Sequence, residues 1–362
     1  MSQQYLVMIC TAARGGMRSV VEGYRNDGVF ERWNVLLLSP HVEAGLLKRL
    51  TTAALAMFQF FGLLLRRRVG LVHCHAAMKG SFWRKSLFAL LARALGVPVI
   101  FHLHGSEMKT FVSRQPKIAR RLIAWVLSRQ SVVVVLSQSW ADYVLSISPE
   151  ARVQILPNYV SLPDLSTKYE PIANKVRLLF LGLVGTRKGV YDLLPAFQKA
   201  FGSCNGLELT IGGNGEVERA QALAQELGVA EHVCFAGWVS GDDKLRLLQE
   251  ADIYVLPSYN EGLPVSILEA MSWGVPVIST RVGGIPELIN QGQDGLLIDA
   301  GDCEGLAKAI LQLAESASVR RAMGAAARNR VVTGFSKAVV LPQLEGLYAG
   351  LTAGRPVLSH SR

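Results

Sequence analysis

The feature that most constrains the fold of this chain is a regular alternation of short apolar segments with longer helical patterns. In the first half, five runs rich in apolar and β-branched residues alternate with helix-like stretches: Tyr5–Cys10, Trp33–Ser39, Gly70–His75, Val97–Gly105 and Ser131–Ser137. Runs separated in this way are typical of buried parallel strands joined by crossover helices. The first half therefore predicts an α/β domain.

A second series of the same kind follows an interruption that contains Pro157, Pro163 and Pro171. Its apolar runs are Val176–Gly182, Leu207–Gly213, Val233–Val239, Ile253–Ser258, Pro276–Gly284 and Asp294–Ile298. Proline and polar residues between two such series indicate a linker. We predict two doubly wound parallel-sheet domains, 1–165 and 166–337, with the boundary near 158–172. A last helix at about 338–352 could pack back on the first domain, and the tail 355–362 is expected to be disordered.

Size and cysteine content agree with two buried cores in a cytoplasmic protein. The chain has 362 residues, of which 50% are hydrophobic, which is enough for two domains. Its five cysteines are odd in number and scattered, so we expect reduced, buried thiols and no disulfide framework. The first residues lack a signal-peptide pattern, and no apolar stretch reaches the length of a clean transmembrane helix.

The positive charge is concentrated in the first half. The formal net charge is +10, and residues 1–170 hold 21 of the 38 Lys and Arg but only 9 of the 28 Asp and Glu. Such a half attracts phosphate groups, of nucleic acid or of anionic lipid. Nucleic acid is the weaker choice, because no helix-turn-helix, zinc-ligand pattern or aromatic RNA-binding signature is present.

Two apolar segments beside basic residues bear on a membrane partner. Ala53–Arg68 is apolar and ends on three arginines, and Arg114–Trp125 mixes lysine and arginine with apolar residues. The first segment suits a buried helix with a basic C-terminus as well as a helix lying on an anionic membrane surface. Both interpretations stay open, and a solvated helix face is the simpler alternative for each basic cluster.

The segment Tyr259–Ala270 places two glutamates around a turn and the start of a helix. Glu261 precedes Gly262, Leu263 and Pro264, and Glu269 lies eight positions after it. Proline suits the first turn of a helix, and the free amides there, including that of Val265, can bind phosphate. We expect the two carboxylates to flank a phosphate and to accept hydrogen bonds from sugar hydroxyls. A capping carboxylate and a solvated glutamate are the structural alternatives.

Other strand-to-helix turns carry cations and glycines. Arg187 and Lys188 follow the strand that ends at Gly182, and they can reach a diphosphate on which negative charge develops. Gly213 lies in a glycine-rich turn, and Gly237 with Trp238 could frame a base. Ligands of open α/β sheets bind at the carboxyl ends of the strands, so these turns are candidate binding sites.

In order and spacing, these motifs resemble the donor-binding domain of glycosyltransferase family 4, retaining enzymes of the GT-B fold. The matching segments are "TRKG", "IGGNGE", "FAGWV" and "PSYNEGLPVSILEAMSWGVPVISTRVGGIPELI"; the first half matches more loosely through "ARGGMRSVV", "VHCH", "FHLHGSE" and "ILPNYV". The resemblance implies an α/β, GT-B architecture of two Rossmann-like domains that face each other across a cleft.

The resemblance also implies roles for single residues. Glu269 would hold the ribose, Glu261 would contact the donor sugar, and Lys188 with Arg187 would neutralise the leaving diphosphate. Gly16 would let the backbone approach the diphosphate from the other domain, and His104 would lie by the reacting sugar. Members commonly carry arginine after the glycine of the "FLG" strand, whereas Leu183 stands here. Either Arg187 takes that role or the diphosphate is held less tightly.

The remaining histidines point to no metal. His73 and His75 would share one face of a strand, but no third or fourth ligand is near in the sequence. We expect them to line the cleft or to pack at the strand end, and His102 to be structural. Glu107 could touch an acceptor or be an ordinary surface glutamate.

The sequence thus predicts a retaining hexosyltransferase that uses a GDP- or UDP-sugar and requires neither cofactor nor metal. Its acceptor would be a lipid-linked glycan of exopolysaccharide, capsule or lipopolysaccharide assembly, reached by peripheral attachment to the inner face of the cytoplasmic membrane. A dinucleotide-dependent oxidoreductase fits poorly, since no G-x-G-x-x-G follows the first strand. A non-catalytic sugar-nucleotide-binding or membrane-docking protein with the same fold is the alternative.

Overall fold

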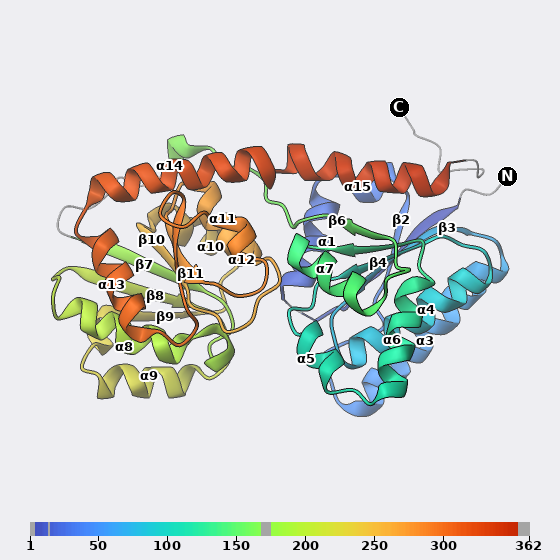
Figure 1. Cartoon of the computed structure of the whole chain (residues 1–362), viewed down its shortest axis with the longest axis horizontal. Coiled ribbons are helices and arrows are strands. Elements are labelled where there is room, and N and C mark those ends of the chain that lie inside the picture. Colours follow the sequence, from blue (N-terminus) through green and yellow to red (C-terminus); the bar gives the residue numbers. More distant parts are fainter. Residues whose placement is uncertain (1–3, 14, 168–174, 354–362) are drawn as a thin grey trace. The chain divides into compact units, whose positions relative to one another are not determined.

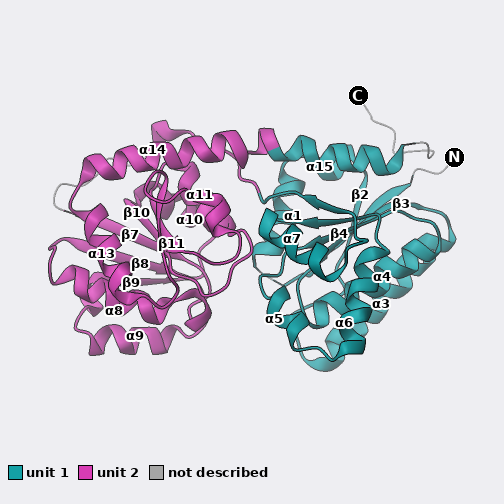
Figure 2. Cartoon of the chain, viewed as in Figure 1, with its two compact units in different colours: residues 1–158, 340–362 teal, residues 159–339 magenta. Residues whose placement is uncertain are grey.

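The computed structural model describes residues 4–13, 15–167 and 175–353. It divides into two compact units, which are described separately below (Figures 1 and 2). Unit 1 comprises residues 1–158 and 340–362, and unit 2 comprises residues 159–339. The predicted tail 355–362 and much of the predicted linker, 168–174, lie outside the described residues.

Unit 1 is built on a six-stranded parallel sheet with the order β2-β1-β3-β4-β5-β6. Its strands are β1 (Tyr5–Ile9), β2 (Val35–Leu38), β3 (Val69–Ala76), β4 (Val99–Leu103), β5 (Val132–Val135) and β6 (Val153–Ile155). The central strands β3 and β4 are buried along their whole length, as expected for strands covered by helices on both faces.

The helices of unit 1 connect successive strands. They are α1 (Gly16–Asn26), α2 (Val29–Arg32), α3 (Leu46–Leu65), α4 (Gly80–Ala94), α5 (Met108–Ser113), α6 (Lys117–Ser128) and α7 (Gln138–Ile147). Helix α15 (Lys337–Thr352) begins in unit 2 and belongs to unit 1 from Val340 onward. The connections from β2 to β3, from β3 to β4 and from β4 to β5 are right-handed crossovers. They place α3, α4 and α6 on the same face of the sheet.

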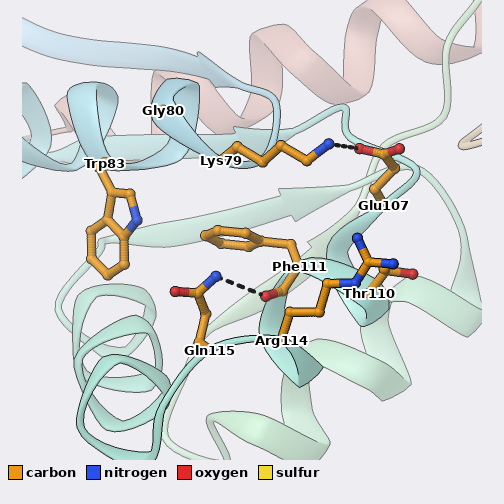
Figure 3. A pocket seen from close by; sticks show the side chains of 8 residues that line it. All are labelled: Lys79, Gly80, Trp83, Glu107, Thr110, Phe111, Arg114 and Gln115. Atoms are coloured by element: carbon orange, nitrogen blue, oxygen red, sulfur yellow. Dashed lines mark hydrogen bonds and ion pairs between the residues drawn. The ribbon is translucent and has the colours of Figure 1, made fainter.

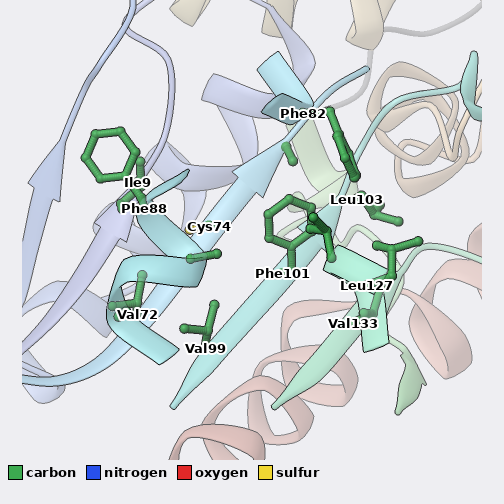
Figure 4. Packing of buried hydrophobic residues seen from close by; sticks show 14 of the residues in the cluster. Ile9, Val72, Cys74, Phe82, Phe88, Val99, Phe101, Leu103, Leu127 and Val133 are labelled. Atoms are coloured by element: carbon green, nitrogen blue, oxygen red, sulfur yellow. The ribbon is translucent and has the colours of Figure 1, made fainter. Parts of the chain in front are cut away.

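The core of unit 1 lies between that face and these helices. Alternate residues of β3, such as Val72 and Cys74, pack against Phe82 and Phe88 of α4 (Figure 4). The ring centroids of Phe60 of α3 and Phe88 lie 5.2 Å apart, and the two rings are tilted by 56°. The other residues of β3, including His73 and His75, point to the opposite face, where Tyr348 of α15 contacts His73.

Unit 2 repeats the architecture with a second six-stranded parallel sheet, in the order β12-β11-β10-β7-β8-β9. Its strands are β7 (Val176–Leu181), β8 (Leu207–Gly212), β9 (Val233–Gly237), β10 (Ile253–Leu256), β11 (Val277–Thr280) and β12 (Gly295–Ile298). The strand order reverses beside β7 and β10, and such a switch point is where open α/β sheets bind ligands.

The helices of unit 2 flank this sheet. They are α8 (Val190–Phe201), α9 (Val217–Glu226), α10 (Gly241–Glu250), α11 (Val265–Ser272), α12 (Ile285–Leu288), α13 (Cys303–Ala314) and α14 (Ala317–Gly334), with short 3-10 turns at Leu165–Thr167, Thr186–Lys188 and Ala230–His232. Two parallel sheets, each flanked by helices, confirm the predicted α/β fold class.

The cysteine prediction was partly wrong. Cys10 and Cys74 are buried thiols, but Cys204 and Cys303 are partly exposed and Cys234 is exposed. Cys234 lies on the edge strand β9, where alternate residues face solvent. No helix among the described residues is both long and apolar enough to cross a membrane.

Candidate active site

At the switch point of unit 2, a lysine and a glutamate from different strand ends form a largely buried ion pair. Lys188, which follows β7, pairs with the Oε1 atom of Glu261, which follows β10. The Ser258 hydroxyl donates a 2.7 Å hydrogen bond to the same oxygen. Glu261 is only 5% exposed. A buried carboxylate that is paired and hydrogen-bonded in this way is held in one orientation.

Backbone contacts fix the loop that carries Glu261. The Tyr259 amide donates to the Arg187 carbonyl at 2.9 Å, and the Thr280 hydroxyl donates to the Ser258 carbonyl at 2.5 Å. Gly283 adopts a φ of 56°, and a Cβ atom there would collide with the Glu261 carbonyl oxygen. Only glycine combines this conformation with so close an approach, so the "VGG" turn is required by the Glu261 loop.

The second glutamate is also paired with a lysine. Glu269 lies on the second turn of α11, and its Oε1 atom accepts a 2.6 Å hydrogen bond from Lys244 of α10. Both side chains are partly exposed. The two glutamates lie near the buried phenol of Tyr254. Burial raises the pKa of Tyr254, and the negative charges of Glu269 and Glu261 raise it further. Glu261 and Glu269 therefore border one region of unit 2.

The predicted helix start is close to the observed one. Helix α11 begins at Val265, and Pro264 is its N-cap residue instead of a residue of the first turn. Gly262 accepts a hydrogen bond from the Gly284 amide at 2.8 Å, and the Leu263 side chain is buried. An eight-residue helix thus starts four residues after Glu261 and carries Glu269.

The predicted glycines line the carboxyl ends of β7, β8 and β9. Gly182 donates to the Gly212 carbonyl, and Gly213 donates to the Gly237 carbonyl at 2.6 Å. At Gly213 a Cβ atom would collide with the Gly182 carbonyl oxygen, so these backbones touch directly. Trp238 follows with 46% of its surface exposed. A glycine-lined backbone edge next to an exposed indole can accommodate a planar ring.

Arg187 remains available at this edge. Its side chain is exposed and makes no ion pair within the part of the chain that the structure describes, whereas Lys188 is paired with Glu261. Leu183, which replaces the arginine common in the resembling family, is 52% exposed. Because Lys188 is paired, Arg187 is the cation of the turn between β7 and α8 that makes no ion pair among the described residues.

In unit 1, one predicted residue begins the helix after β1 and the other directly follows β4. Gly16 is the first residue of α1, and a Cβ atom there would meet nothing within 4 Å. His104 follows β4, and its amide donates to the Ala76 carbonyl at 2.9 Å. The His104 Nε2 atom lies 2.8 Å from His75 Nδ1.

Four histidines that are separate in the sequence form one stacked cluster. His73 Nε2 lies 3.2 Å from His102 Nδ1, and His73 Nδ1 lies 2.7 Å from the Tyr348 hydroxyl. Burial, with the charge of His104 as a smaller cause, lowers the pKa of His73 to about 3. Burial and then Lys85 lower the pKa of His104 to about 3. These imidazoles are neutral at physiological pH.

His102, on the neighbouring strand β4, is the third histidine that the sequence spacing of His73 and His75 does not show. One nitrogen each of His73, His75 and His102 lies within 4.8 Å of the others. The surroundings oppose a divalent cation, however. The neutral imidazoles are themselves in the form that can bind metal, but the ammonium of Lys85 is one of the charges that lower the pKa of His75, and it repels a cation there. His102, expected to be structural, is part of this network.

A hollow of about 290 Å³ lies at the start of α4 and beside α5 (Figure 3). Trp83 and Phe111 give it an aromatic lining, and Gln115 borders it. The Lys79 ammonium lies 3.0 Å from the Glu107 carboxylate at its edge. Glu107 therefore lines a cavity and is not an isolated surface glutamate. Indole stacking beside mixed polar groups suits a sugar ring.

Sequence reasoning missed Ser258 and Lys244, the partners of the two glutamates. Ser258 ends the "IYVLPS" run and could have been recognised as a polar residue at a strand end. Lys244 lies on a different helix, 25 residues before Glu269, and nothing in the linear spacing pairs the two.

Two parallel α/β units with polar strand ends are the architecture of a large class of glycosyltransferases. Residues 6–159 match the family described as glycosyl transferase 4-like domain, and residues 164–330 match glycosyl transferases group 1. The two matches together span most of both units, so the chain belongs to these glycosyltransferase families. The predicted resemblance is confirmed.

Curated bacterial relatives agree. N-acetyl-alpha-D-glucosaminyl L-malate synthase of Bacillus anthracis is 28% identical over 295 residues, which cover 78% of this chain and 75% of that protein. The lipopolysaccharide core biosynthesis glycosyltransferase LpsE of Rhizobium meliloti is 29% identical over 221 residues, which cover 60% of this chain and 62% of LpsE.

Solved structures share the fold of the whole chain. Sucrose-phosphate synthase of Thermosynechococcus elongatus aligns with a TM-score of 0.81 at 20% identity, covering 97% of this chain and all of that one. HepE of Anabaena in complex with UDP aligns with a TM-score of 0.76 at 17% identity, covering 96% of this chain and all of HepE. At these identities the likeness concerns the fold alone.

Proposed function

We propose that the chain is a retaining glycosyltransferase that moves a hexose from a GDP- or UDP-sugar to a lipid-linked glycan. The observation that carries the proposal is the Lys188–Glu261–Ser258 arrangement at the switch point of unit 2, directly before α11. It joins a cation, an oriented carboxylate and free helix amides, which are the groups needed to bind a diphosphate joined to a sugar.

Each group has a part in the proposed reaction. Glu261 accepts hydrogen bonds from the hydroxyls of the donor sugar, and Glu269 accepts those of the ribose. As the bond between the anomeric carbon and the phosphate oxygen breaks, Lys188, Arg187 and the α11 amides stabilise the diphosphate. The acceptor oxygen bonds to the same face of that carbon, and its proton passes to the departing phosphate oxygen. No step in this scheme uses a metal.

The donor assignment draws on the comparisons. HepE, whose fold this chain shares, is described in complex with UDP. The open edge formed by Gly182, Gly213 and Gly237, next to Trp238, offers space for a nucleobase. We infer that a nucleoside diphosphate occupies this edge, with its ribose toward Glu269 and its phosphates toward Lys188.

The acceptor belongs to unit 1 in this proposal. The relative LpsE is named for lipopolysaccharide core biosynthesis, and we place this chain in a pathway of the same kind. The hollow lined by Trp83, Phe111 and Glu107 is of a size and polarity that suits one sugar unit of the acceptor (Figure 3).

Peripheral attachment to an anionic membrane is part of the proposal. Helix α3 buries Ala56, Phe60 and Leu64, yet Leu47 and Phe58 on another side of it are 76% and 77% exposed. On α6, Ile118, Leu122 and Trp125 form an exposed stripe at helical spacing beside basic residues. Exposed apolar stripes next to cations suit the headgroup region of an anionic bilayer.

The transfer reaction tests the site assignment. Glu261→Gln keeps the shape of the side chain but removes the charge, and Lys188→Ala removes the cation. Each should lower kcat by at least about a hundredfold, measured as hexose transfer from a radiolabelled UDP- or GDP-sugar to a membrane extract. Lys308→Ala, an exposed lysine of α13, is the control. Wild-type rates in both site variants would contradict the proposal.

A further inference from the structure

Several cations of unit 1 meet at the carboxyl ends of β2, β1 and β3 without carboxylate partners. Lys85 and Arg84 lie near the start of α4, which follows β3, and Arg49 lies in the first turn of α3. His41 follows β2, and its Nδ1 atom lies 3.1 Å from the hydroxyl of Thr11, which follows β1. The strand order β2-β1-β3 brings these loops to the same edge of the sheet.

Lys85 is the most unusual member of this group, because it is a fully buried lysine. Its Nζ atom makes one hydrogen bond within the described residues, 3.2 Å to the Ser81 hydroxyl. Ser81 lies one turn earlier, so the ammonium points back toward the start of α4 and the sheet edge. An ammonium has three donors, and a buried charge without a counter-ion is costly.

The neighbours of Lys85 add to the positive charge. The Arg84 Nε atom is buried without a hydrogen-bond partner, and no ion pair of Arg84 or Arg49 occurs in the described parts of the chain. Burial and then Arg84, Arg49 and Lys85 lower the pKa of His41. Two acidic groups offset these charges only in part: Glu43, which is exposed, raises the pKa of His41 as the smallest of the causes, and Glu22 is paired with Arg18 at 2.8 Å.

We propose that Lys85, Arg84, Arg49 and His41 form a subsite for a phosphate or diphosphate dianion on unit 1. A multiply charged oxyanion supplies both the missing counter-charge and the acceptors for the unused N–H donors. This inference rests on the proposed function, because the dianion would belong to a substrate of the transfer reaction.

The dianion that fits best is the phosphate group of the lipid-linked acceptor. Arg49 lies on the same helix as the exposed apolar residues Leu47 and Phe58. A lipid whose chains contact that side of α3 would bring its phosphate to the start of the helix. The diphosphate of the nucleotide donor has the same chemistry and is the other possible source.

Calorimetric titration of the full chain with inorganic pyrophosphate, with and without saturating UDP, tests the subsite. Wild type should bind pyrophosphate, and Lys85→Met and Arg84→Gln should each weaken binding by about tenfold or more. Lys308→Met, the same change at an exposed lysine of unit 2, should bind like wild type. Thermal unfolding verifies that each variant is folded; Lys85→Met should unfold at no lower temperature than wild type.

The outcomes separate this inference from the proposed function. The subsite is ruled out if wild type does not bind pyrophosphate, or if both subsite variants bind it with wild-type affinity. This holds whether or not UDP binds. Failure of both UDP and GDP to bind contradicts the proposed function, whereas the titration without nucleotide still decides the subsite. When both variants weaken binding, displacement of pyrophosphate by farnesyl diphosphate identifies the acceptor as the source, and displacement by UDP identifies the donor.

Discussion

At the scale of single residues, the two units differ in whether their buried or partly buried lysines have carboxylate partners. In unit 2, Lys188 is paired with Glu261 and Lys244 with Glu269. In unit 1, Lys85 is buried next to arginines and neutral imidazoles and has no carboxylate partner among the described residues. The members of a buried ion pair need no further partner until a ligand competes for one of them. An unpaired buried cation, in contrast, is stabilised only when an anion binds.

The unpaired lysine predicts an unusual pH dependence of stability. Burial and then Arg84 lower the pKa of Lys85 to about 8, from 10.5. The other groups that interact with it are two thiols with raised pKa values and three histidines: Cys10, Cys74, His41, His75 and His104. The folded state holds fewer protons than the unfolded chain between these two pKa values, so stability rises with pH there.

Lys85→Met should therefore increase the free energy of unfolding at neutral pH, by on the order of 3 kcal/mol. The full increase in unfolding free energy applies below pH 8. It shrinks as the pH rises toward 10.5, because the wild-type lysine then becomes neutral. Urea unfolding of both proteins at several pH values measures it. A variant that is less stable than wild type at neutral pH would show that Lys85 has a counter-ion.

At the scale of elements, the sequence predicted most of what the backbone does. Strand runs such as Val176–Gly182 and the helix after Pro264 were predicted because hydrophobic period and glycine or proline punctuation are local properties. The pairing of Lys244 with Glu269, and the meeting of His73 with His102, depend on which strands and helices become neighbours. Those contacts follow from sheet order, which linear spacing does not encode.

The turn after β11 offers a test of how an element positions the site. In Gly283→Ala the new Cβ atom would collide with the Glu261 carbonyl oxygen, so the Glu261 loop must shift. We expect a loss of about 1–3 kcal/mol in unfolding free energy and weaker nucleotide binding, measured by denaturation and calorimetry. Gly346→Ala, on an exposed side of α15 with open space around it, should be neutral or stabilising. Equal behaviour of the two variants would contradict the close contact.

Helix α3 gives a second prediction at this scale. The double variant Leu47→Ser and Phe58→Ser removes two exposed apolar side chains while leaving the buried Phe60 in place. It should weaken binding to vesicles that contain anionic lipid, as measured by co-sedimentation, because the two most exposed of the large apolar side chains on this helix are gone. Leu245→Ser, an exposed leucine of α10 in unit 2, should sediment like wild type. Unchanged binding by the α3 variant would exclude this helix as the attachment site.

At the scale of the whole molecule, the chain consists of two α/β units that carry different features. Unit 2 carries the lysine–glutamate pair and the glycine edge, and matches glycosyl transferases group 1. Unit 1 carries the basic cluster, the aromatic hollow and the exposed helices, and matches the glycosyl transferase 4-like domain. The highly specific motif Pro257–Ile289 made the family recognisable from sequence. The features that we propose to bind the acceptor were not, since they are assembled from α3, α4 and α5.

The central claim is that unit 2 binds a nucleoside diphosphate through Glu269 and the Lys188–Glu261 pair. Thermal unfolding with UDP, GDP and ADP, on wild type and Glu269→Ala, tests it most directly. One nucleotide at a hundred times its dissociation constant should add about 2.7 kcal/mol to the stability of wild type, and the shift should disappear or shrink strongly in Glu269→Ala. An equal shift in both proteins would contradict the ribose role of Glu269, and no shift with any nucleotide would contradict the donor site itself.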